Sequence, residues 1–189
     1  MRKKKRGIFG MFVLIAFIVI LLAVVCAAFL VNHYYPLRHL DIISKYAEDN
    51  GLNADFVCAV IHAESRFNEN AVSNMGASGL MQIIEGTAYW LAPRAGIDDF
   101  DYGQIFDPEI NIRIGCYYLG MLERHFGDTE VALSAYNAGS GNVEEWLNNP
   151  EYSSDGKTLD YIPFPETRNY IQRVADSQRI YALILRVRG

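Results

Sequence analysis

Glu64 lies where the sequence best suits proton-transfer chemistry. Three apolar residues, Val57, Val60 and Ile61, precede it by seven, four and three positions, so all four side chains share one face of a predicted helix over 54–67. Glu64 therefore continues a buried stripe and stands in the last turn, beside the negative end of the helix dipole. Both effects disfavour the carboxylate, so we expect a pKa above the ordinary value of about 4.3. A carboxylic acid that stays protonated near neutral pH suits general acid catalysis.

The same spacing also fits a last-turn glutamate whose tip simply reaches solvent. The residues after Glu64 bear on the choice, because the small and polar stretch NENAVSNMGASG cannot comfortably continue a helix. Gly76 and Gly79 allow the backbone to adopt a positive φ or to come close to a ligand. A loop of this kind directly after a buried acid is consistent with a binding site for an extended molecule.

Other catalytic chemistry has weaker support. The four histidines are scattered along the chain, at His33, His39, His62 and His125. The sequence contains no HExxH motif and no paired CxxC motif, so we expect no metal and no cofactor. Cys58 and His62 could touch on one helix, but a Cys–His hydrolase takes its pair from separate elements. Cys58 and Cys116 lie in apolar helical patterns and are expected to be buried thiols, although a disulfide between them stays open.

The elements around these residues are predicted to be helices, which makes the fold class all-α. Helical periodicity and end signals predict helices over 37–49, 54–67, 88–92, 108–126, 130–138, 142–148 and 165–186. The expected N-caps are Asn53, Thr87, Asp107 and Thr129, with Pro108 at a first helical position. The longest irregular stretch, 149–164, is an ordinary loop or a flap over a groove.

The N-terminal segment predicts a membrane anchor. Residues 1–6 read MRKKKR, and residues 7–31 contain no charge, which is enough length to cross a bilayer core of roughly 30 Å as one transmembrane helix. The stretch is too long for a typical cleaved signal peptide, and Cys26 makes a poor lipoprotein box. By the positive-inside rule the basic tip stays in the cytoplasm, so the rest of the chain lies outside the cytoplasmic membrane. We therefore divide the chain into a basic tip, signal anchor and short tether over 1–36 and a catalytic domain over 37–189.

The exported part is acidic. Of 17 Lys and Arg, five lie in the basic tip, which leaves 12 against 22 Asp and Glu. Nucleic acid is therefore excluded as a partner, because its recognition needs a basic face.

Three separated motifs give the domain a family resemblance. They are Glu64-Ser65 followed by GASGLMQI over 76–83, AYNAG over 135–139, and IPFPETRNYIQRV over 162–174. In this order and spacing the chain resembles the catalytic domain of the soluble lytic transglycosylases, lysozyme-like enzymes that cleave bacterial peptidoglycan. The match spans roughly residues 40–180. Asn74 and Glu85-Gly86 depart from common family residues beside the motifs.

The resemblance implies a mechanism with a single acid. Glu64 would protonate the oxygen between N-acetylmuramic acid and N-acetylglucosamine, then act as base on the sugar's own 6-hydroxyl to form a 1,6-anhydromuramic end. It also implies that substrate-binding residues surround Glu64, namely Ser73, Met81, Gln82, Tyr136, Asn137, Glu166 and Tyr170. Ser65 is expected to be a structural hydrogen-bonder. Peptidoglycan glycan strands are the expected partner, with membrane-bound cell-wall or secretion-machine proteins as further candidates.

Two alternatives stay open. A hydrolytic muramidase would use a second acid, for which Asp98, Asp99 and Asp101 are candidates, although their polar run looks like a solvated loop. A catalytically silent wall-binding module is the other, and the presence of Glu64 and Tyr136 argues against it.

Overall fold

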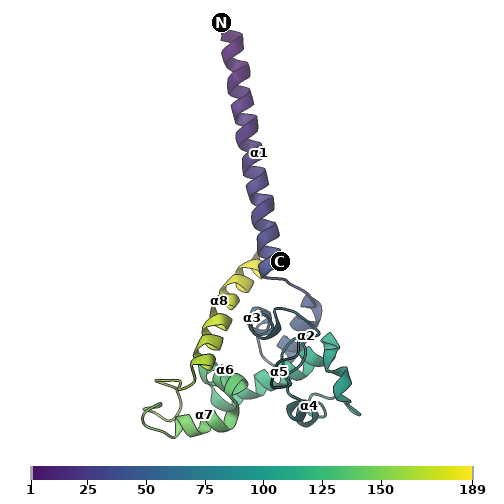
Figure 1. Ribbon diagram of the computed structural model, residues 1–189, viewed down its shortest axis with the longest axis vertical. Coiled ribbons are helices and arrows are strands. Elements are labelled where there is room, and N and C mark those ends of the chain that lie inside the picture. Colours follow the sequence, from purple (N-terminus) through teal and green to yellow (C-terminus); the bar gives the residue numbers. More distant parts are fainter. Residues whose placement is uncertain (1, 189) are drawn as a thin grey trace. The chain divides into compact units, whose positions relative to one another are not determined.

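The computed structural model describes residues 2–188, without the side chains of 2–10, 12, 13 and 188. The chain forms two compact units that meet between Pro36 and Leu37. The first unit contains α1 (Arg2–Tyr34). The second contains α2 (Leu40–Asp49), α3 (Ala54–Ser65), α4 (Glu85–Leu91), the 3-10 helix η1 (Tyr102–Phe106), α5 (Pro108–Phe126), α6 (Thr129–Ala138), α7 (Ser140–Leu147) and α8 (Pro165–Arg188) (Figure 1).

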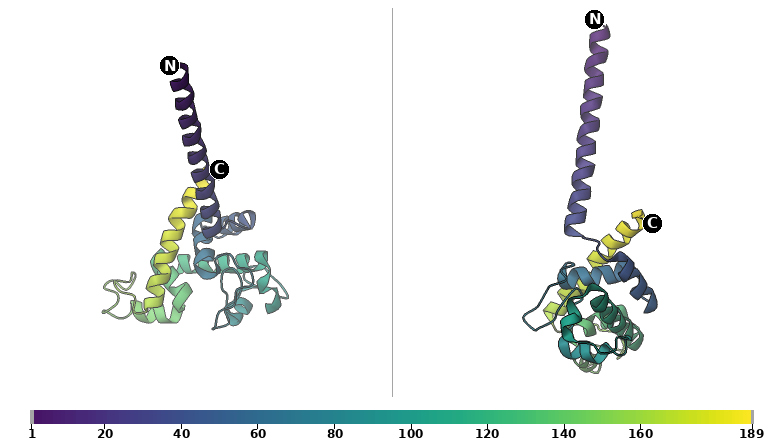
Figure 2. Two further views of the ribbon diagram at one scale, coloured as in Figure 1. Left: turned by 45° about the horizontal axis from the view of Figure 1, so that its top comes forward. Right: turned by 90° about the vertical axis from the view of Figure 1, so that its right-hand side faces the viewer.

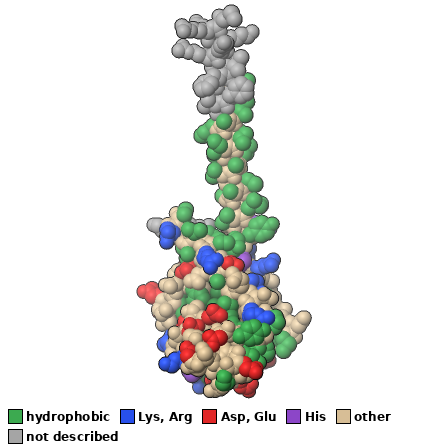
Figure 3. Space-filling view, turned by 90° about the vertical axis from the view of Figure 1, so that its left-hand side faces the viewer, with side chains coloured by type: hydrophobic (Ala, Val, Ile, Leu, Met, Phe, Trp, Pro, Cys, Tyr) green, Lys and Arg blue, Asp and Glu red, His purple; other side chains and the backbone are tan. Residues whose placement is uncertain are grey.

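Helix α1 has the length and composition of a membrane span. The segment Leu14–Tyr34 is apolar enough to cross a bilayer, and its described side chains are mostly hydrophobic in Figure 3. The basic side chains of the tip, and those of most residues from 7 to 13, lie outside the described part. The helix continues to Tyr34, beyond the predicted end at 31, so the irregular link to α2 is residues 35–39.

The second unit is built from helices, as predicted. Within residues 37–188 the only strand-like pairing described consists of two isolated bridges, between Val72 and Ser78 and between Ser78 and Ile83. Helix α3 packs against α8, while α5 packs against both α2 and α6. In Figure 1 and in the left view of Figure 2, α7 and α8 lie on one side of this unit and α4 on the other, with α5 between them. Acidic side chains gather on the face shown in Figure 3.

The best-defined helix in the sequence is also the best predicted. Asp107 caps α5 by accepting hydrogen bonds from the backbone N–H groups of Glu109 and Ile110, at 2.9 and 3.1 Å, and Pro108 occupies its first turn. Gly127 ends the helix with a left-handed backbone, φ +68°. Its side-chain cap, first-turn proline and terminal glycine are local signals that depend only on neighbouring residues.

Other predicted boundaries were wrong by a few residues. Helix α2 starts at Leu40, after His39 in a left-handed conformation, and α4 starts at Glu85 without the predicted Thr87 cap. Asn53 precedes α3 but makes no side-chain cap bond. Asp128, not Thr129, caps α6, accepting from the Val131 N–H at 2.9 Å.

The polar run before α5 is more ordered than expected. Residues Tyr102–Phe106 form η1, and Asp101 caps it by accepting from the Gly103 N–H at 2.8 Å.

The segment over 149–164 is held by its own polar groups. Asp155, for example, accepts from the N–H groups of Lys157 and Thr158, both at 2.8 Å.

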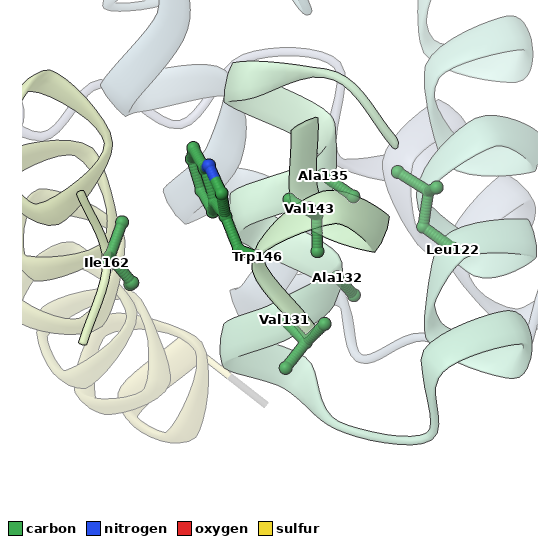
Figure 4. Close-up of a cluster of buried hydrophobic side chains, with 7 residues drawn as sticks. All are labelled: Leu122, Val131, Ala132, Ala135, Val143, Trp146 and Ile162. Carbon is green, nitrogen blue, oxygen red and sulfur yellow. The ribbon is translucent and has the colours of Figure 1, made fainter. Parts of the chain in front are cut away.

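A cluster of buried apolar side chains fixes α6 in place. It joins α5, α6, α7 and the segment before α8 through Leu122, Val131, Ala132, Ala135, Val143, Trp146 and Ile162 (Figure 4). Tyr136, the next residue on α6, packs against this cluster. Because these side chains are close-packed, the position of Tyr136 is set by the core and not by a loop.

Candidate active site

Glu64 stands at the carboxyl end of α3. Val57, Val60 and Ile61 on the same face are fully buried, whereas Glu64 itself is half-buried. The helix ends directly after it, because Arg66 adopts a left-handed backbone conformation with φ +53° and Phe67 follows with φ +62°. The carboxyl group therefore remains reachable at the end of an otherwise buried helix face.

The loop after α3 folds back onto the helix end. Ser65 donates its hydroxyl to the carbonyls of Ile61 and Leu80, at 3.2 and 2.8 Å, which confirms its predicted structural role. Gln82, in a left-handed conformation with φ +49°, donates its side-chain amide to the carbonyl of Gly79 at 2.9 Å. These bonds hold the segment 78–82 beside the carboxyl end of α3.

Asn111 anchors the same segment from α5. Its Oδ1 accepts from the Met81 N–H at 2.7 Å, and its Nδ2 donates to the carbonyls of Ser78 and Ile105 at 3.1 and 2.9 Å. Gly79 makes this approach possible, since a Cβ there would lie 2.1 Å from Asn111 Nδ2. Asn111 was not predicted from the sequence, although a polar residue flanked by Ile110 and Ile112 on an apolar helix could have pointed to a buried hydrogen-bonding role.

Two tyrosines from different helices lie near enough to Glu64 for its charge to raise their pKa values. The Tyr136 hydroxyl on α6 donates to the Met81 carbonyl at 2.8 Å. Tyr170 on α8 is 1% exposed, and its hydroxyl makes no hydrogen bond of ordinary geometry. It is nevertheless close enough to the Glu64 carboxyl for the two groups to shift each other's pKa.

The electrostatics of this cluster favour a protonated acid. Burial raises the pKa of Glu64 from 4.5 to about 7, and the Tyr170 hydroxyl and the Arg173 guanidinium oppose that rise. The pKa values of both Tyr136 and Tyr170 are raised well above their ordinary value, first by burial and then by the negative charge of Glu64. No other carboxylate within residues 2–188 contributes to the shift at Glu64. The site can thus hold a proton at neutral pH and release it to a bound substrate.

Two predicted substrate contacts need correction. Met81 is 0% exposed, and a Cβ at Gly115 would lie 2.2 Å from its Sδ, so its side chain belongs to the core and lines no sugar subsite. Tyr170 is also buried, so its hydroxyl faces Glu64 instead of forming an exposed wall. Both corrections arise from packing between elements, such as Met81 against Gly115 of α5, which local periodicity cannot reveal.

The other predicted contacts differ in exposure. Ser73 and Glu166 are exposed, and the Ser73 hydroxyl accepts from the Ala77 N–H at 3.1 Å. Asn137 is half-buried, and its Oδ1 accepts from the Thr167 hydroxyl at 2.8 Å. Thr167 was not predicted; it is 1% exposed and links α6 to the first turn of α8.

Competing chemistries find little support in the geometry. Burial raises the pKa of the Cys58 thiol to about 12, and His62 Nδ1 lies 3.0 Å from the Ser177 hydroxyl. Cys58 and Cys116 are free and buried, as predicted. No group of three His, Cys, Asp or Glu side chains suited to a metal ion occurs among the described residues.

The chain is similar to known lytic transglycosylases. The sequence model of the family described as Transglycosylase SLT domain matches residues 41–158. The chain is 38% identical over 143 residues to the soluble lytic murein transglycosylase of Salmonella typhimurium, which covers 74% of this chain and 22% of the relative. It is 29% identical over 171 residues to the membrane-bound lytic murein transglycosylase C of Edwardsiella ictaluri. That match covers 78% of this chain and 47% of the relative. The chain thus spans less than half the length of these relatives.

Solved structures of similar proteins share the fold. Lytic transglycosylase Slt from Pseudomonas aeruginosa, solved as an inactive mutant with glutamine in place of a glutamate, superposes with a TM-score of 0.72 at 33% identity. The 70 kDa soluble lytic transglycosylase of Escherichia coli gives a TM-score of 0.71 at 32% identity. Each comparison covers 82% of this chain and 26% of the solved chain. With an all-helical, lysozyme-like domain and a family match over residues 41–158, this chain belongs to the transglycosylase SLT domain family.

Proposed function

We propose that this protein is a peptidoglycan lytic transglycosylase in which Glu64 is both general acid and general base. The observation that carries the proposal is the half-buried carboxyl of Glu64 at the end of α3, with a pKa raised to about 7 by burial and the Tyr170 hydroxyl close to it. A pKa near the working pH is what a group needs in order to give up a proton and then take one back. The similar Pseudomonas aeruginosa enzyme is likewise inactive when one of its glutamates is replaced by glutamine.

In the first step the Glu64 carboxylic acid donates its proton to the glycosidic oxygen between N-acetylmuramic acid and N-acetylglucosamine. The bond between that oxygen and C1 of the muramic residue breaks, and the electron pair leaves with the oxygen. Glu64 is left as a carboxylate. The Tyr170 hydroxyl and the Arg173 guanidinium, which both favour the ionised form of Glu64, stabilise it at this stage.

In the second step the carboxylate takes the proton from the 6-hydroxyl of the same muramic residue. Its oxygen closes onto C1, which gives a 1,6-anhydromuramic end and restores the protonated acid without consuming water. The attached hydroxyl outcompetes water because its effective concentration at C1 is very high. Ser73, Gln82, Asn137 and Glu166 are the proposed contacts to the glycan.

The products of digestion test this proposal against its alternatives. Purified peptidoglycan should yield muropeptides with anhydro ends, detected by mass spectrometry. A hydrolytic muramidase would yield reducing ends that are one water heavier, and a silent wall-binding module would yield no cleavage. Asp98, Asp99 and Asp101 give the muramidase no support, since all three are exposed and Asp101 caps η1.

We also propose that α1 crosses the bacterial cytoplasmic membrane once, with the basic tip inside and residues 37–189 outside. The apolar segment Leu14–Tyr34 and the membrane-bound relative from Edwardsiella ictaluri support this placement. A thiol-reactive, membrane-impermeant reagent should label a cysteine introduced at Glu145, exposed on α7, in intact cells whose outer envelope has been made permeable. A cysteine introduced at Lys4 should stay unlabelled until the cytoplasmic membrane is disrupted. The opposite labelling pattern would refute the proposed topology.

A further inference from the structure

The last turns of α8 carry exposed apolar side chains on the side that faces away from α3. Leu183 and Val187 are 60% and 86% exposed. They are four positions apart, so they lie on the same side of the helix. Tyr181 points the other way, because it is fully buried and its ring packs against the His62 ring of α3, with centroids 5.9 Å apart. The packing that holds α8 in the fold therefore does not account for the exposed pair.

Arginines share the exposed side of these turns. Arg179 and Arg186 are exposed and lie four positions before and three positions after Leu183. Arg179 pairs with Asp176 at 3.3 Å, and its side chain remains 77% exposed. From residue 177 onward the chain has three arginines and no Asp or Glu, whereas the exported part as a whole has 12 Lys and Arg against 22 Asp and Glu. We call this basic and apolar surface the C-terminal face; its residues are Arg179, Leu183, Arg186 and Val187.

The C-terminal face lies at the end of the second unit where the chain enters it. His39, directly before α2, contacts Glu69 at 2.8 Å. Two positions before Glu69, the ring of Phe67 packs on the ring of Tyr181, with centroids 6.0 Å apart. This short segment joins the entry of the unit to the last turns of α8. Figure 1 and the right view of Figure 2 show the entry and these turns at the same end of the second unit.

The link between the two units keeps that entry close to the proposed membrane. The apolar segment Leu14–Tyr34 ends where α1 ends, and the irregular residues 35–39 reach at most about 17 Å when extended. A surface this close to a bilayer can bury apolar side chains among lipid headgroups, and its arginines can contact anionic lipid. The C-terminal face offers both kinds of side chain, on an otherwise acidic domain.

Given the proposed membrane span of α1, on which this inference rests, we propose that the C-terminal face of α8 docks on the outer surface of the same membrane. Leu183 and Val187 enter the headgroup region, and Arg179 and Arg186 contact anionic lipid headgroups. The tether alone limits how far the second unit can move, whereas docking also fixes its orientation. The Glu64 carboxyl is then held at a set height above the bilayer.

Lipid contact is measured on the full chain in nanodiscs of phosphatidylcholine and phosphatidylglycerol, with one chain in each disc so that copies cannot pair. In a Cys26→Ser background, an NBD probe is attached to a cysteine introduced at Val187; Cys58 and Cys116 are buried and stay unlabelled. Nitroxide-labelled lipid should quench this probe, and its emission should move to shorter wavelength. A probe at Glu145, exposed on α7, should show neither effect.

Neutralising the arginines should weaken docking. From the quenched fraction, Arg179→Gln and Arg186→Gln should each lower the docking equilibrium by about 5-fold, the contribution of one arginine near anionic lipid. Leu183→Gln should also lower it, because less apolar surface is then buried. Lys157→Gln is the matched control, since Lys157 is exposed in the segment that precedes the first turn of α8 and lies toward the other end of that helix. It should leave the quenching unchanged.

Equal quenching of the probes at Val187 and Glu145 would overturn the proposed docking, because the tether alone would then explain it. Quenching at Val187 that survives all three α8 variants would overturn it as well. A probe at Val187 with blue-shifted emission that lipid nitroxides do not quench would show that another part of the chain covers this face, which also contradicts docking. Failure of the proposed function would instead appear as native digests without anhydro ends, while the quenching persists.

Discussion

Ionisation of Glu64 works against folding. Burial raises its pKa from 4.5 to about 7. The proton on Glu64 therefore contributes fully to the free energy of unfolding below about pH 4.5, and this contribution is lost as the pH rises through about 7. The full shift corresponds to at most about 3 kcal/mol, and partial exposure of the carboxyl reduces this to about 1–2 kcal/mol. Glu64→Gln should therefore be more stable than the native chain at pH 8 and gain little at pH 4.5, while turnover falls at least about 100-fold.

Chemical denaturation at the two pH values, together with a turnover assay, checks this prediction. Glu145→Gln is the control, since Glu145 is exposed on α7 and its neutralisation should change neither quantity. A Glu64→Gln variant that retained turnover would exclude Glu64 as the acid. A stability gain that was equal at both pH values would show that the buried charge is not its source.

Tyr170 should favour the ionised form of Glu64 during the reaction. Its hydroxyl lowers the pKa of Glu64, so Tyr170→Phe should raise that pKa and move the alkaline limb of the pH–rate profile to higher pH. The maximal rate should fall, because the carboxylate formed in the first step loses a nearby hydroxyl that favours its ionised form. The measurement is kcat against pH on isolated glycan strands. An unchanged alkaline limb would show that Tyr170 is only a core residue.

The end of α3 sets where the loop after Glu64 begins. Arg66 ends α3 in a left-handed conformation that costs a non-glycine residue about 1–2 kcal/mol. Arg66→Gly should therefore raise the free energy of unfolding, by about 0.5–1 kcal/mol after the added freedom of the unfolded chain is subtracted.

Gly127→Ala is the reverse substitution, which adds a Cβ at the left-handed end of α5. Gly127 has φ +68° and open space where a Cβ would stand, so only the backbone cost acts there, and the variant should lose about 1 kcal/mol. Urea denaturation of both variants measures the difference. If Arg66→Gly destabilised the domain, the Arg66 side chain would have to contribute more than its backbone conformation costs.

Short-range signals predicted these elements well, and longer-range contacts explain the errors. Asp107, Pro108 and Gly127 marked α5 correctly, because caps and terminal glycines act within one turn. The predicted 37–49 and 54–67 helices were too long, because His39 and Arg66 take left-handed conformations that their residue types do not announce. His39 also contacts Glu69, 30 positions away, at 2.8 Å.

For the molecule as a whole, the link between its two units limits where it can work. The irregular stretch is five residues, 35–39, which reach at most about 17 Å when extended, and Pro36 stiffens it. We expect the proposed enzyme to act on glycan strands close to the membrane. A flexible Gly/Ser insertion of about 40 residues after Pro36 should spread cleavage through the wall, as measured by labelling new and old peptidoglycan. Uniform cleavage by the native chain, unchanged by the insertion, would contradict this expectation.

The sequence by itself determined the helical class, the apolar span, and Glu64 at the end of a buried stripe. Each follows from periodicity, composition or capping over a few consecutive residues. The surroundings of Glu64 came only from tertiary structure. Asn111 and Tyr136 reach Met81 from 30 and 55 positions away, and Tyr170 reaches Glu64 from a separate helix. Burial and hydrogen bonding of Met81, Asn111 and Tyr170 depend on which helices cover them, and that choice is made by packing between elements, which no local pattern encodes.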